Sequence, residues 1–291
     1  MRLFRRTHDE EAPAVEEPAE FAAPLNDVQQ EALDALRSEG IAVLPFDRLI
    51  GDAALWQGLT GDIDSWAESA QSRVRRNLTT PTEKDDFLIR RYRAGKAAAD
   101  APSREARFAP TNPWLRFGVQ SGILDIVNTY RGRATKLVDL DQWYTVPFGA
   151  GYDRVQSQRW HRDPEDRHVV KVFVYFSDVD QGAGPFEYVR GSAEGARYGD
   201  LWPWGEAEWY PPQDEFAAKI PAEEHVAVTG PRGTVILCDT SGFHRGGFAE
   251  TTPRILSFHT FVSPDSDQRR KFTVDWRDGG DLSEHARYAL A

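Results

Sequence analysis

The sequence predicts an α+β protein with a mainly β core, built as an antiparallel sandwich or jelly roll with helices packed on it. Short runs of β-branched and aromatic residues follow one another after residue 134, with no helices alternating between them. Such runs favour an antiparallel arrangement over a parallel α/β sheet. Helical patterns precede residue 134, and aromatic residues make up 12% of the chain, which suits a β-rich body.

The N-terminal part opens with an acidic tail. Residues 1–24 are rich in Glu, Ala and Pro and poor in side chains that pack, so we expect them to be disordered. A first helix is predicted to begin at Asn26, whose side chain can form a capping box with Gln29, and to end at Gly40. The run IAVLPF that follows predicts a short buried strand.

Two further helices are predicted before the β core. One lies near Ile63–Asn77, and the other runs from about Asn112 to Arg131. The second carries apolar residues at helical spacing, namely Leu115, Val119, Ile123, Ile126 and Val127. The helical part is therefore expected to span residues 25–133.

The β core is predicted over residues 134–264. Its strands are the runs ATKLVDLDQWYTV, HVVKVFVYFSDV, GPFEYVRGS, HVAVTG, GTVILCD and PRILSFHTFV. Segment 198–216 interrupts them with three tryptophans and three prolines, which is typical of a long ordered loop that covers a site. With residues 265–291 as a C-terminal extension, residues 25–291 are expected to form a single domain.

The overall charge and the cysteine content limit the partners and the compartment. Lys and Arg number 35 against 46 Asp and Glu, and a formal charge of -11 disfavours nucleic acid and anionic membranes as partners. Cys238, the one cysteine, lies in an apolar run and is expected to be a small buried hydrophobe, which fits a reducing compartment. No secretory signal or membrane span is seen, so the predicted location is the cytoplasm. The oligomeric state stays open.

The stretch QRWHRDPEDRH, residues 158–168, contains the first candidate site residues. His161 and Asp163 stand two apart, and Pro164 favours an extended conformation for the aspartate before it. Residues two apart in an extended segment point to the same side, so these two side chains are expected to converge.

A second cluster follows in DTSGFHRGGFAETTPRILSFHTFV. His244 lies there among serine and glycine residues that allow a close backbone approach, and Arg254 opens a strand ten residues later. The same-side neighbours of Arg254 are Leu256 and Phe258, and an arginine on an apolar face is costly unless it meets an anion. Its planar guanidinium suits a carboxylate. Two imidazoles and one carboxylate with open coordination positions are the ligands of non-haem Fe(II) oxygenases.

These residues resemble the phytanoyl-CoA dioxygenase family of Fe(II)- and 2-oxoglutarate-dependent oxygenases. The resemblance rests on HRD at 161–163, GPFEYVRGS at 184–192, His244 and Arg254, and covers roughly residues 26 to 264. It implies a double-stranded β-helix (a jelly roll, cupin-like) with helices packed outside. It also implies that His161, Asp163 and His244 bind the iron and that Arg254 binds the C5 carboxylate of 2-oxoglutarate. Further 2-oxoglutarate contacts are proposed, by position, for Gln158, Tyr144 and Lys171.

The chemistry implied by this resemblance uses Fe(II), 2-oxoglutarate and O₂. Decarboxylation of 2-oxoglutarate to succinate and CO₂ accompanies oxidation of a small-molecule substrate, most often hydroxylation of a C–H bond. Halogenating relatives have Gly or Ala at the position of Asp163, so the carboxylate favours hydroxylation. Desaturation, ring closure and epoxidation stay open, and so does the identity of the substrate.

Several other residues are given ordinary structural interpretations. His168 is expected in a loop, and His259 as a packed or surface histidine on the face opposite Arg254. Glu165 and Asp166 are expected to keep their loop soluble or to pair with Arg162 and Arg167. The basic run 87–96 is interpreted as a solvated strand and loop, with an anion clamp as the alternative. The aromatic residues of segment 198–216 could either line the substrate pocket or anchor the loop.

Two functions of other classes compete with the oxygenase. One is a jelly-roll protein that binds a metal or ligand without turnover, which predicts a broken triad or a missing keto-acid arginine. The other is a cupin-like enzyme that uses another divalent metal, which predicts additional His or Glu ligands near the first pair. The sequence has neither feature.

Overall fold

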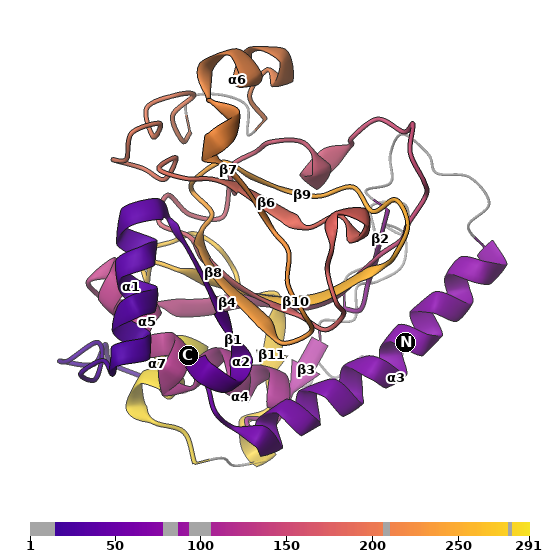
Figure 1. The fold of residues 1–291 in the computed structure, drawn as a ribbon. Coiled ribbons are helices and arrows are strands. Elements are labelled where there is room, and N and C mark those ends of the chain that lie inside the picture. Colours follow the sequence, from indigo (N-terminus) through magenta and orange to yellow (C-terminus); the bar gives the residue numbers. More distant parts are fainter. Residues whose placement is uncertain (1–14, 78–86, 93–105, 206–209, 279–280) are drawn as a thin grey trace, which may run out of the picture.

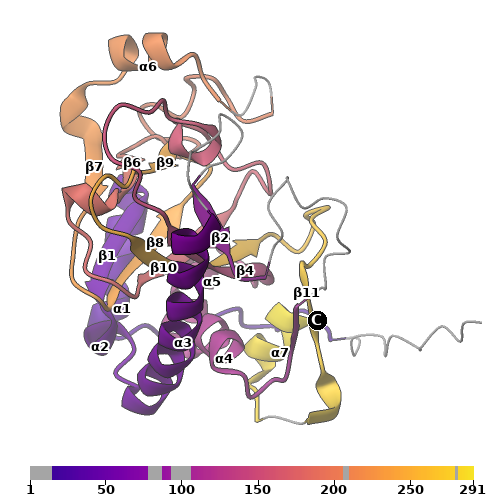
Figure 2. The same ribbon diagram turned by 90° about the vertical axis from the view of Figure 1, so that its right-hand side faces the viewer.

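The computed structural model describes residues 15–77, 87–92, 106–205, 210–278 and 281–291. Two antiparallel sheets face each other, and most of the helices lie against the outer face of the larger sheet (Figures 1 and 2). None of the helices in these ranges is both long and apolar enough to cross a membrane.

The larger sheet has six strands in the order β1-β8-β5-β10-β4-β2, and every neighbouring pair is antiparallel. The strands are β1 (Ile41–Pro45), β2 (Leu88–Arg90), β4 (Lys136–Thr145), β5 (Val170–Tyr175), β8 (Thr234–Asp239) and β10 (Arg254–Val262). Strand β10 lies between β4 and β5, where its residues are buried almost throughout. Residues two apart on these strands share a face, so each strand supplies one set of side chains to the helices and another to the smaller sheet.

The smaller sheet has three antiparallel strands in the order β7-β6-β9. They are β7 (His225–Val228), β6 (Phe186–Val189) and β9 (His244–Gly246). Aromatic and aliphatic side chains from both sheets meet between them, among them Phe173, Tyr175, Phe186, Tyr188 and Phe258. The predicted antiparallel sandwich is therefore present, and its six predicted strand runs each contain a strand.

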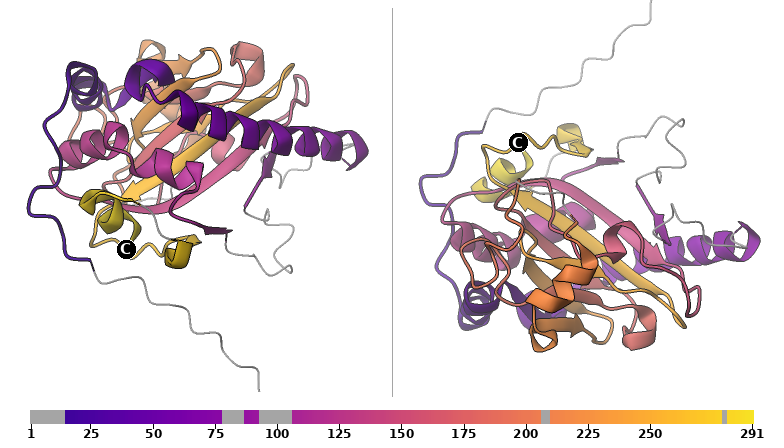
Figure 3. Two further views of the ribbon diagram at one scale, coloured as in Figure 1. Left: turned by 90° about the horizontal axis from the view of Figure 1, so that it is seen from below. Right: turned by 90° about the horizontal axis from the view of Figure 1, so that it is seen from above.

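The helices form the outer layer. They are α1 (Asp27–Glu39), α2 (Phe46–Leu49), α3 (Ala53–Asn77), α4 (Pro113–Val119), α5 (Ser121–Arg131), α6 (Gln213–Lys219) and α7 (Glu284–Leu290). The predicted capping box of Asn26 and Gln29 is present in α1, and Gly40 ends that helix in the left-handed region at φ 83°. Seen from below, α3 runs across the larger sheet, and seen from above, α6 lies over the sandwich (Figure 3).

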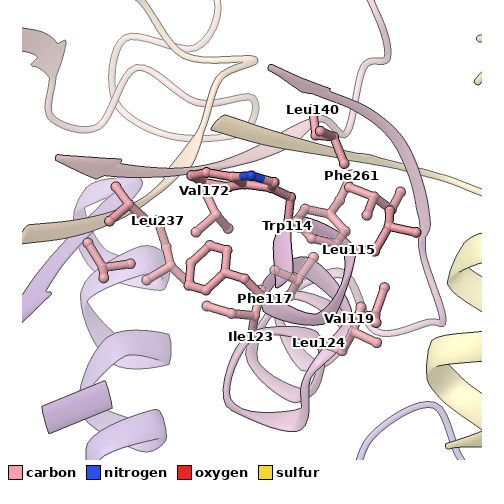
Figure 4. Packing of buried hydrophobic residues seen from close by; sticks show 14 of the residues in the cluster. Trp114, Leu115, Phe117, Val119, Ile123, Leu124, Leu140, Val172, Leu237 and Phe261 are labelled. Carbon is pink, nitrogen blue, oxygen red and sulfur yellow. The ribbon is translucent and has the colours of Figure 1, made fainter. Parts of the chain in front are cut away.

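Two predicted helices differ from those observed. Helix α3 begins at Ala53, ten residues before the predicted Ile63. The helix predicted from Asn112 to Arg131 is two helices, because Gln120 between them is extended at φ -75° and ψ 155°. The break lets both helices turn their apolar faces to the sheet, where Trp114, Phe117 and Ile123 pack against strand residues such as Val172 and Leu237 (Figure 4).

The C-terminal extension closes the same core. Ala286, Ala289 and Leu290 of α7 belong to the cluster that α1, α4 and α5 form on the sheet. Strands β3 (Ala106–Phe108) and β11 (Phe272–Val274) pair in parallel beside it, and both were missed in the sequence. The single domain over residues 25–291 stays a prediction, and this shared core supports it.

The segment before α1 differs from the expected tail where it is described. Residues 15–24 have no helix or strand, but they contact the helices. Asn128 of α5 donates its side-chain amide to the Phe21 carbonyl at 2.7 Å, and Ala23 donates its N–H to Asp125 at 3.2 Å. These contacts hold residues 15–24 against the body, while residues 1–14 lie outside the described part.

His259 is buried on the helix-facing side of β10, which confirms its interpretation as a packed histidine. It is 0% exposed, and its Nε2–H donates to the Trp114 carbonyl at 2.8 Å. Its Nδ1 has no hydrogen-bond partner among the described residues. Burial lowers the pKa of His259 to about 4, because a proton added at Nδ1 would place an unpaired charge in the core.

We expect this histidine to make the fold less stable in acid. Between pH 6.5, its ordinary pKa, and about pH 4, the unfolded chain binds a proton there that the folded chain does not, so the free energy of unfolding decreases as the pH is lowered. When the pH is lowered across that window, the free energy of unfolding of the His259→Gln variant should fall by about 3 kcal/mol less than that of the unmodified protein. Urea unfolding at several pH values measures the difference, and two parallel pH dependences would contradict it.

Candidate metal centre

The candidate metal centre lies between the two sheets, where an irregular segment before β5 meets the start of β9. His161 and His244 form an isolated antiparallel bridge, in which each N–H donates to the other's carbonyl at 3.0 Å. The N–H of Asp163 donates to the Thr240 carbonyl, also at 3.0 Å. These backbone bonds join two segments that are about 80 residues apart in the sequence.

The structure brings the three predicted ligands together. The Nε2 of His244 lies 3.4 Å from Oδ2 of Asp163, and the Nε2 of His161 lies 3.9 Å from Oδ1. The three candidate ligand atoms all lie within 4.8 Å of one another. That spacing allows one ion to contact all three.

The hydrogen bonds of the two imidazoles orient them as ligands. The Nδ1–H of His161 donates to the Arg159 carbonyl at 2.8 Å, and that of His244 donates to the Gly242 carbonyl at 3.0 Å. Each ring therefore presents an unprotonated Nε2 to the centre, as outer hydrogen bonds do for metal-binding histidines. Burial, and then the nearby His244, lower the pKa of His161 to about 3, which keeps this ring neutral.

The carboxylate of Asp163 is kept ionised although it is buried. Burial alone would raise the pKa of Asp163, but the Lys171 ammonium 2.7 Å from Oδ2 holds it well below its usual range. The centre therefore offers two neutral nitrogens and one anionic oxygen, a donor set that suits Fe(II).

A buried guanidinium lies in the same cavity. Arg254 is 3% exposed, and its hydrogen bonds within the described residues go to the Gly184 carbonyl and to the Thr145 hydroxyl. Its Nε has no partner there, and no carboxylate of those residues pairs with it. Burial lowers the pKa of Arg254. A buried cation in this position is stabilised by an anionic ligand.

The cavity encloses about 250 Å³ and extends from Arg254 past the triad to a charged end. Its walls include Trp143, Phe173, Phe186, Leu256 and Phe258, and Asp139, Glu165 and Lys171 lie at the charged end. Gly246 leaves room at the Arg254 end, because a Cβ there would lie 3.3 Å from a terminal nitrogen of Arg254. The cavity can therefore hold a small anion and a second small molecule around one metal site.

A family model described as phytanoyl-CoA dioxygenase (PhyH) matches residues 28–254. The chain belongs to the phytanoyl-CoA dioxygenase family. The family predicted from HRD, His244 and Arg254 is thereby confirmed, and membership supports iron- and 2-oxoglutarate-dependent oxygenase activity. None of the curated proteins matches the sequence of this chain.

Several solved structures have a similar fold. EctD from S. alaskensis with 2-oxoglutarate and 5-hydroxyectoine is 16% identical at a TM-score of 0.53, over 94% of this chain and 93% of that one. The epimerase SnoN in complex with Fe3+, alpha ketoglutarate and nogalamycin RO is 15% identical at 0.51, over 84% and 86%. AviO1 from Streptomyces viridochromogenes Tue57 is 17% identical at 0.50, over 84% and 98%. The predicted jelly-roll class is confirmed.

Of the three additional contacts predicted for this phytanoyl-CoA dioxygenase family member, only Gln158 and Lys171 reach the cavity. Gln158 accepts a hydrogen bond from the Val155 N–H through Oε1, and its buried Nε2 has no partner among the described residues. Lys171 lies against Asp163 and Glu165, away from Arg254 at the charged end. The role of each as a 2-oxoglutarate contact stays a prediction.

Tyr144 is not brought to the cavity, which corrects its placement beside the site. Side chains alternate along β4, so Trp143 and Thr145 face the cavity while Tyr144 packs with Ile89 and Val146 on the other side. The same alternation adds Thr145 and Asp139 to the cavity wall, and the sequence analysis missed both.

The tryptophan-rich segment contributes mainly anchors. Trp202 packs on Phe216 and Phe243, and the indole N–H of Trp204 donates to the Asp163 carbonyl at 2.9 Å. Among the aromatic residues of this segment that the structure describes, only Tyr210 lines the cavity, with its ring centroid 5.5 Å from that of His161. Trp209 lies outside the described residues, and α6 begins at Gln213, before the predicted end of the loop.

The basic run 87–96 and the charged residues 165–168 make contacts that the sequence did not predict. In the basic run 87–96, Arg91 pairs with Asp62 at 2.5 Å, which argues against an anion clamp at that residue, and residues 93–96 lie outside the described part. Glu165 lines the cavity and does not pair with Arg162. Arg167 pairs with Glu194 instead of its sequence neighbours, and His168 is not part of the triad. Cys238 is fully buried, as predicted.

Proposed function

We propose that this protein uses Fe(II), 2-oxoglutarate and O₂ to oxidise a small molecule, with hydroxylation of a C–H bond as the reaction. The observation that carries the proposal is one cavity that contains both the triad and a buried guanidinium with no carboxylate partner among the described residues. A protein that bound only a metal would have no use for such a guanidinium. The similar folds of EctD and SnoN hold 2-oxoglutarate or alpha ketoglutarate, which supports the same cosubstrate here.

The residues present fit the iron. His161 and His244 would supply neutral nitrogens and Asp163 a carboxylate oxygen, which leaves other coordination positions for the cosubstrate and O₂. When bound, the iron supplies the oxidising chemistry that is driven by decarboxylation of 2-oxoglutarate to succinate and CO₂. The Asp163 carboxylate fills the position that a halide would need, so it favours hydroxylation over halogenation.

The protein's own side chains bind and orient the cosubstrate. The Arg254 guanidinium would receive the C5 carboxylate in the glycine-lined end of the cavity, beside the Thr145 hydroxyl. The free N–H group of Gln158 would donate to an oxygen of the same molecule. Leu256, Phe173 and Phe186 exclude water around it, which strengthens these charged contacts.

The opposite end of the cavity would bind the substrate. Asp139 and Glu165 accept, Lys171 donates, and Trp143 and Phe258 provide aromatic surface. This composition suits a small polar molecule rather than a long hydrocarbon chain. The single cysteine makes no use of an oxidising compartment, which leads us to propose the cytoplasm as its location.

Anaerobic titration with Fe(II) and then 2-oxoglutarate tests the proposal. We expect a visible charge-transfer band that requires both components, and formation of succinate once O₂ is admitted. If the band forms but no succinate is produced with any of a set of small polar substrates, a binding protein without turnover would be favoured. Absence of the band in a protein with an unchanged circular dichroism spectrum would contradict the proposal.

A further inference from the structure

Arg162 stands between the two candidate ligands of the HRD motif, yet it does not face the solvent. It is 3% exposed, and none of the described residues forms an ion pair with it. Its guanidinium carbon lies 3.8 Å from the ring centroid of Phe243, the residue just before His244. Burial lowers the pKa of Arg162 to about 10, so the side chain stays charged at neutral pH.

All three nitrogens of the guanidinium donate hydrogen bonds to backbone carbonyls. Nε donates to Trp202 at 3.3 Å, and the terminal nitrogens donate to Ser192 at 2.7 Å, Gly199 at 3.0 Å, Leu201 at 3.1 Å and also to Ser241. An arginine has five N–H donors, and here each finds a carbonyl. A buried cation is expensive unless its hydrogen bonds are satisfied, so this arrangement holds only while all five carbonyls stay in place.

These carbonyls belong to two segments that the metal centre needs. Ser241 lies in the turn that leads to His244, and the others lie in residues 192–204, which we call the anchored loop. Two further hydrogen bonds, which do not involve Arg162, join the anchored loop to the ligand segments. The Trp204 indole donates to the Asp163 carbonyl at 2.9 Å, and the Phe243 N–H donates to the Ser192 hydroxyl at 2.7 Å.

We propose that Arg162 is a positioning residue that couples metal occupancy to the order of the anchored loop. Any shift of His161 or Asp163 toward a bound ion moves the backbone of Arg162, and with it the guanidinium that holds the anchored loop. The coupling is reciprocal, so a loosened loop weakens metal binding by the same factor as metal binding orders the loop. The inference rests on the proposed metal site.

The test compares Arg162→Gln with Arg232→Gln, a control whose arginine pairs with Asp64 and has no ion pair with the anchored loop. Mn(II) affinity is measured by electron paramagnetic resonance, and amide hydrogen exchange is followed over residues 192–204 with and without Mn(II). In the unmodified protein and the control, we expect Mn(II) to slow exchange there. In Arg162→Gln, we expect the Mn(II) dissociation constant to rise by about 10- to 100-fold and the metal-dependent protection to disappear.

The outcomes separate this inference from the proposed function. If the unmodified protein does not bind Mn(II), the metal site itself is wrong and the coupling falls with it. If Arg162→Gln binds Mn(II) as the unmodified protein does, or keeps the metal-dependent protection, the coupling alone is wrong. Should Arg162→Gln fail to fold, Trp204→Phe is the second variant, which removes the indole hydrogen bond to the Asp163 carbonyl and keeps an aromatic side chain. We expect a several-fold weaker Mn(II) affinity with reduced protection, and no change in either would overturn the proposal.

Discussion

Replacement of Asp163 by alanine is expected to abolish succinate formation and to weaken Mn(II) or Fe(II) binding by at least about 100-fold. Loss of an outer hydrogen-bond partner of a metal ligand costs about 10- to 100-fold, and loss of the only anionic ligand should exceed that. The Lys171 ammonium increases the effect, because it would then face the incoming metal ion without the carboxylate between them.

The control for this variant is Asp153→Ala, which removes an exposed carboxylate ten residues away. Both proteins should keep the circular dichroism spectrum of the unmodified protein. Chloride-free buffer is needed, because removal of the Asp163 side chain leaves room for a small anion at the metal. Metal affinity within a few-fold of the unmodified value would refute Asp163 as a ligand.

Replacement of Arg254 by glutamine is expected to raise the dissociation constant of 2-oxoglutarate on the order of 100-fold. Truncation of one partner of a buried, hydrogen-bonded charge pair costs about 2–5 kcal/mol. Mn(II) affinity measured without 2-oxoglutarate should change little, because Arg254 does not contact the triad in the described structure. Calorimetric titration of the Mn(II)-loaded protein gives both constants.

Two comparison variants make the Arg254 result specific. Arg254→Lys keeps the charge but not the planar pair of donors, so its 2-oxoglutarate affinity should fall between those of the unmodified protein and Arg254→Gln. Arg232→Ala removes an arginine that pairs with Asp64 far from the cavity and should leave both constants unchanged. Unaltered binding of 2-oxoglutarate by Arg254→Gln would remove the assignment.

The sequence predicted the elements whose patterns are long enough to repeat. The strands of the larger sheet carry runs of β-branched and aromatic residues, and α1 has both of its caps. Strand β9 has only three residues, two of them after His244, which is too short for any pattern. The early start of α3 could not be predicted, because Gly58 and Gly61 lower the helix propensity of its first half. The structure gives a reason for Gly58: a Cβ there would lie 3.4 Å from Pro113, where α4 packs on α3.

The candidate ligands could be predicted because their chemistry is unusual at their positions. A histidine and an aspartate before proline, and an arginine on an apolar strand face, each require a partner. Tyr144 could not be placed correctly, because a shift of one residue along a strand exchanges the two faces. The suggested pairing of Arg162 with Glu165 or Asp166 is not found among the described residues, because its partners are backbone carbonyls, which the sequence does not reveal.

The ion pair between Lys171 and Asp163 balances the charge of the candidate metal centre. A buried carboxylate next to two neutral imidazoles would otherwise leave an unbalanced negative charge in the interior. The lysine serves as a built-in counter-ion that keeps the Asp163 carboxylate stable beside the two histidines. A bound Fe(II) would take over the neutralisation of Asp163, and the Lys171 ammonium would remain within reach of Glu165, 3.5 Å away.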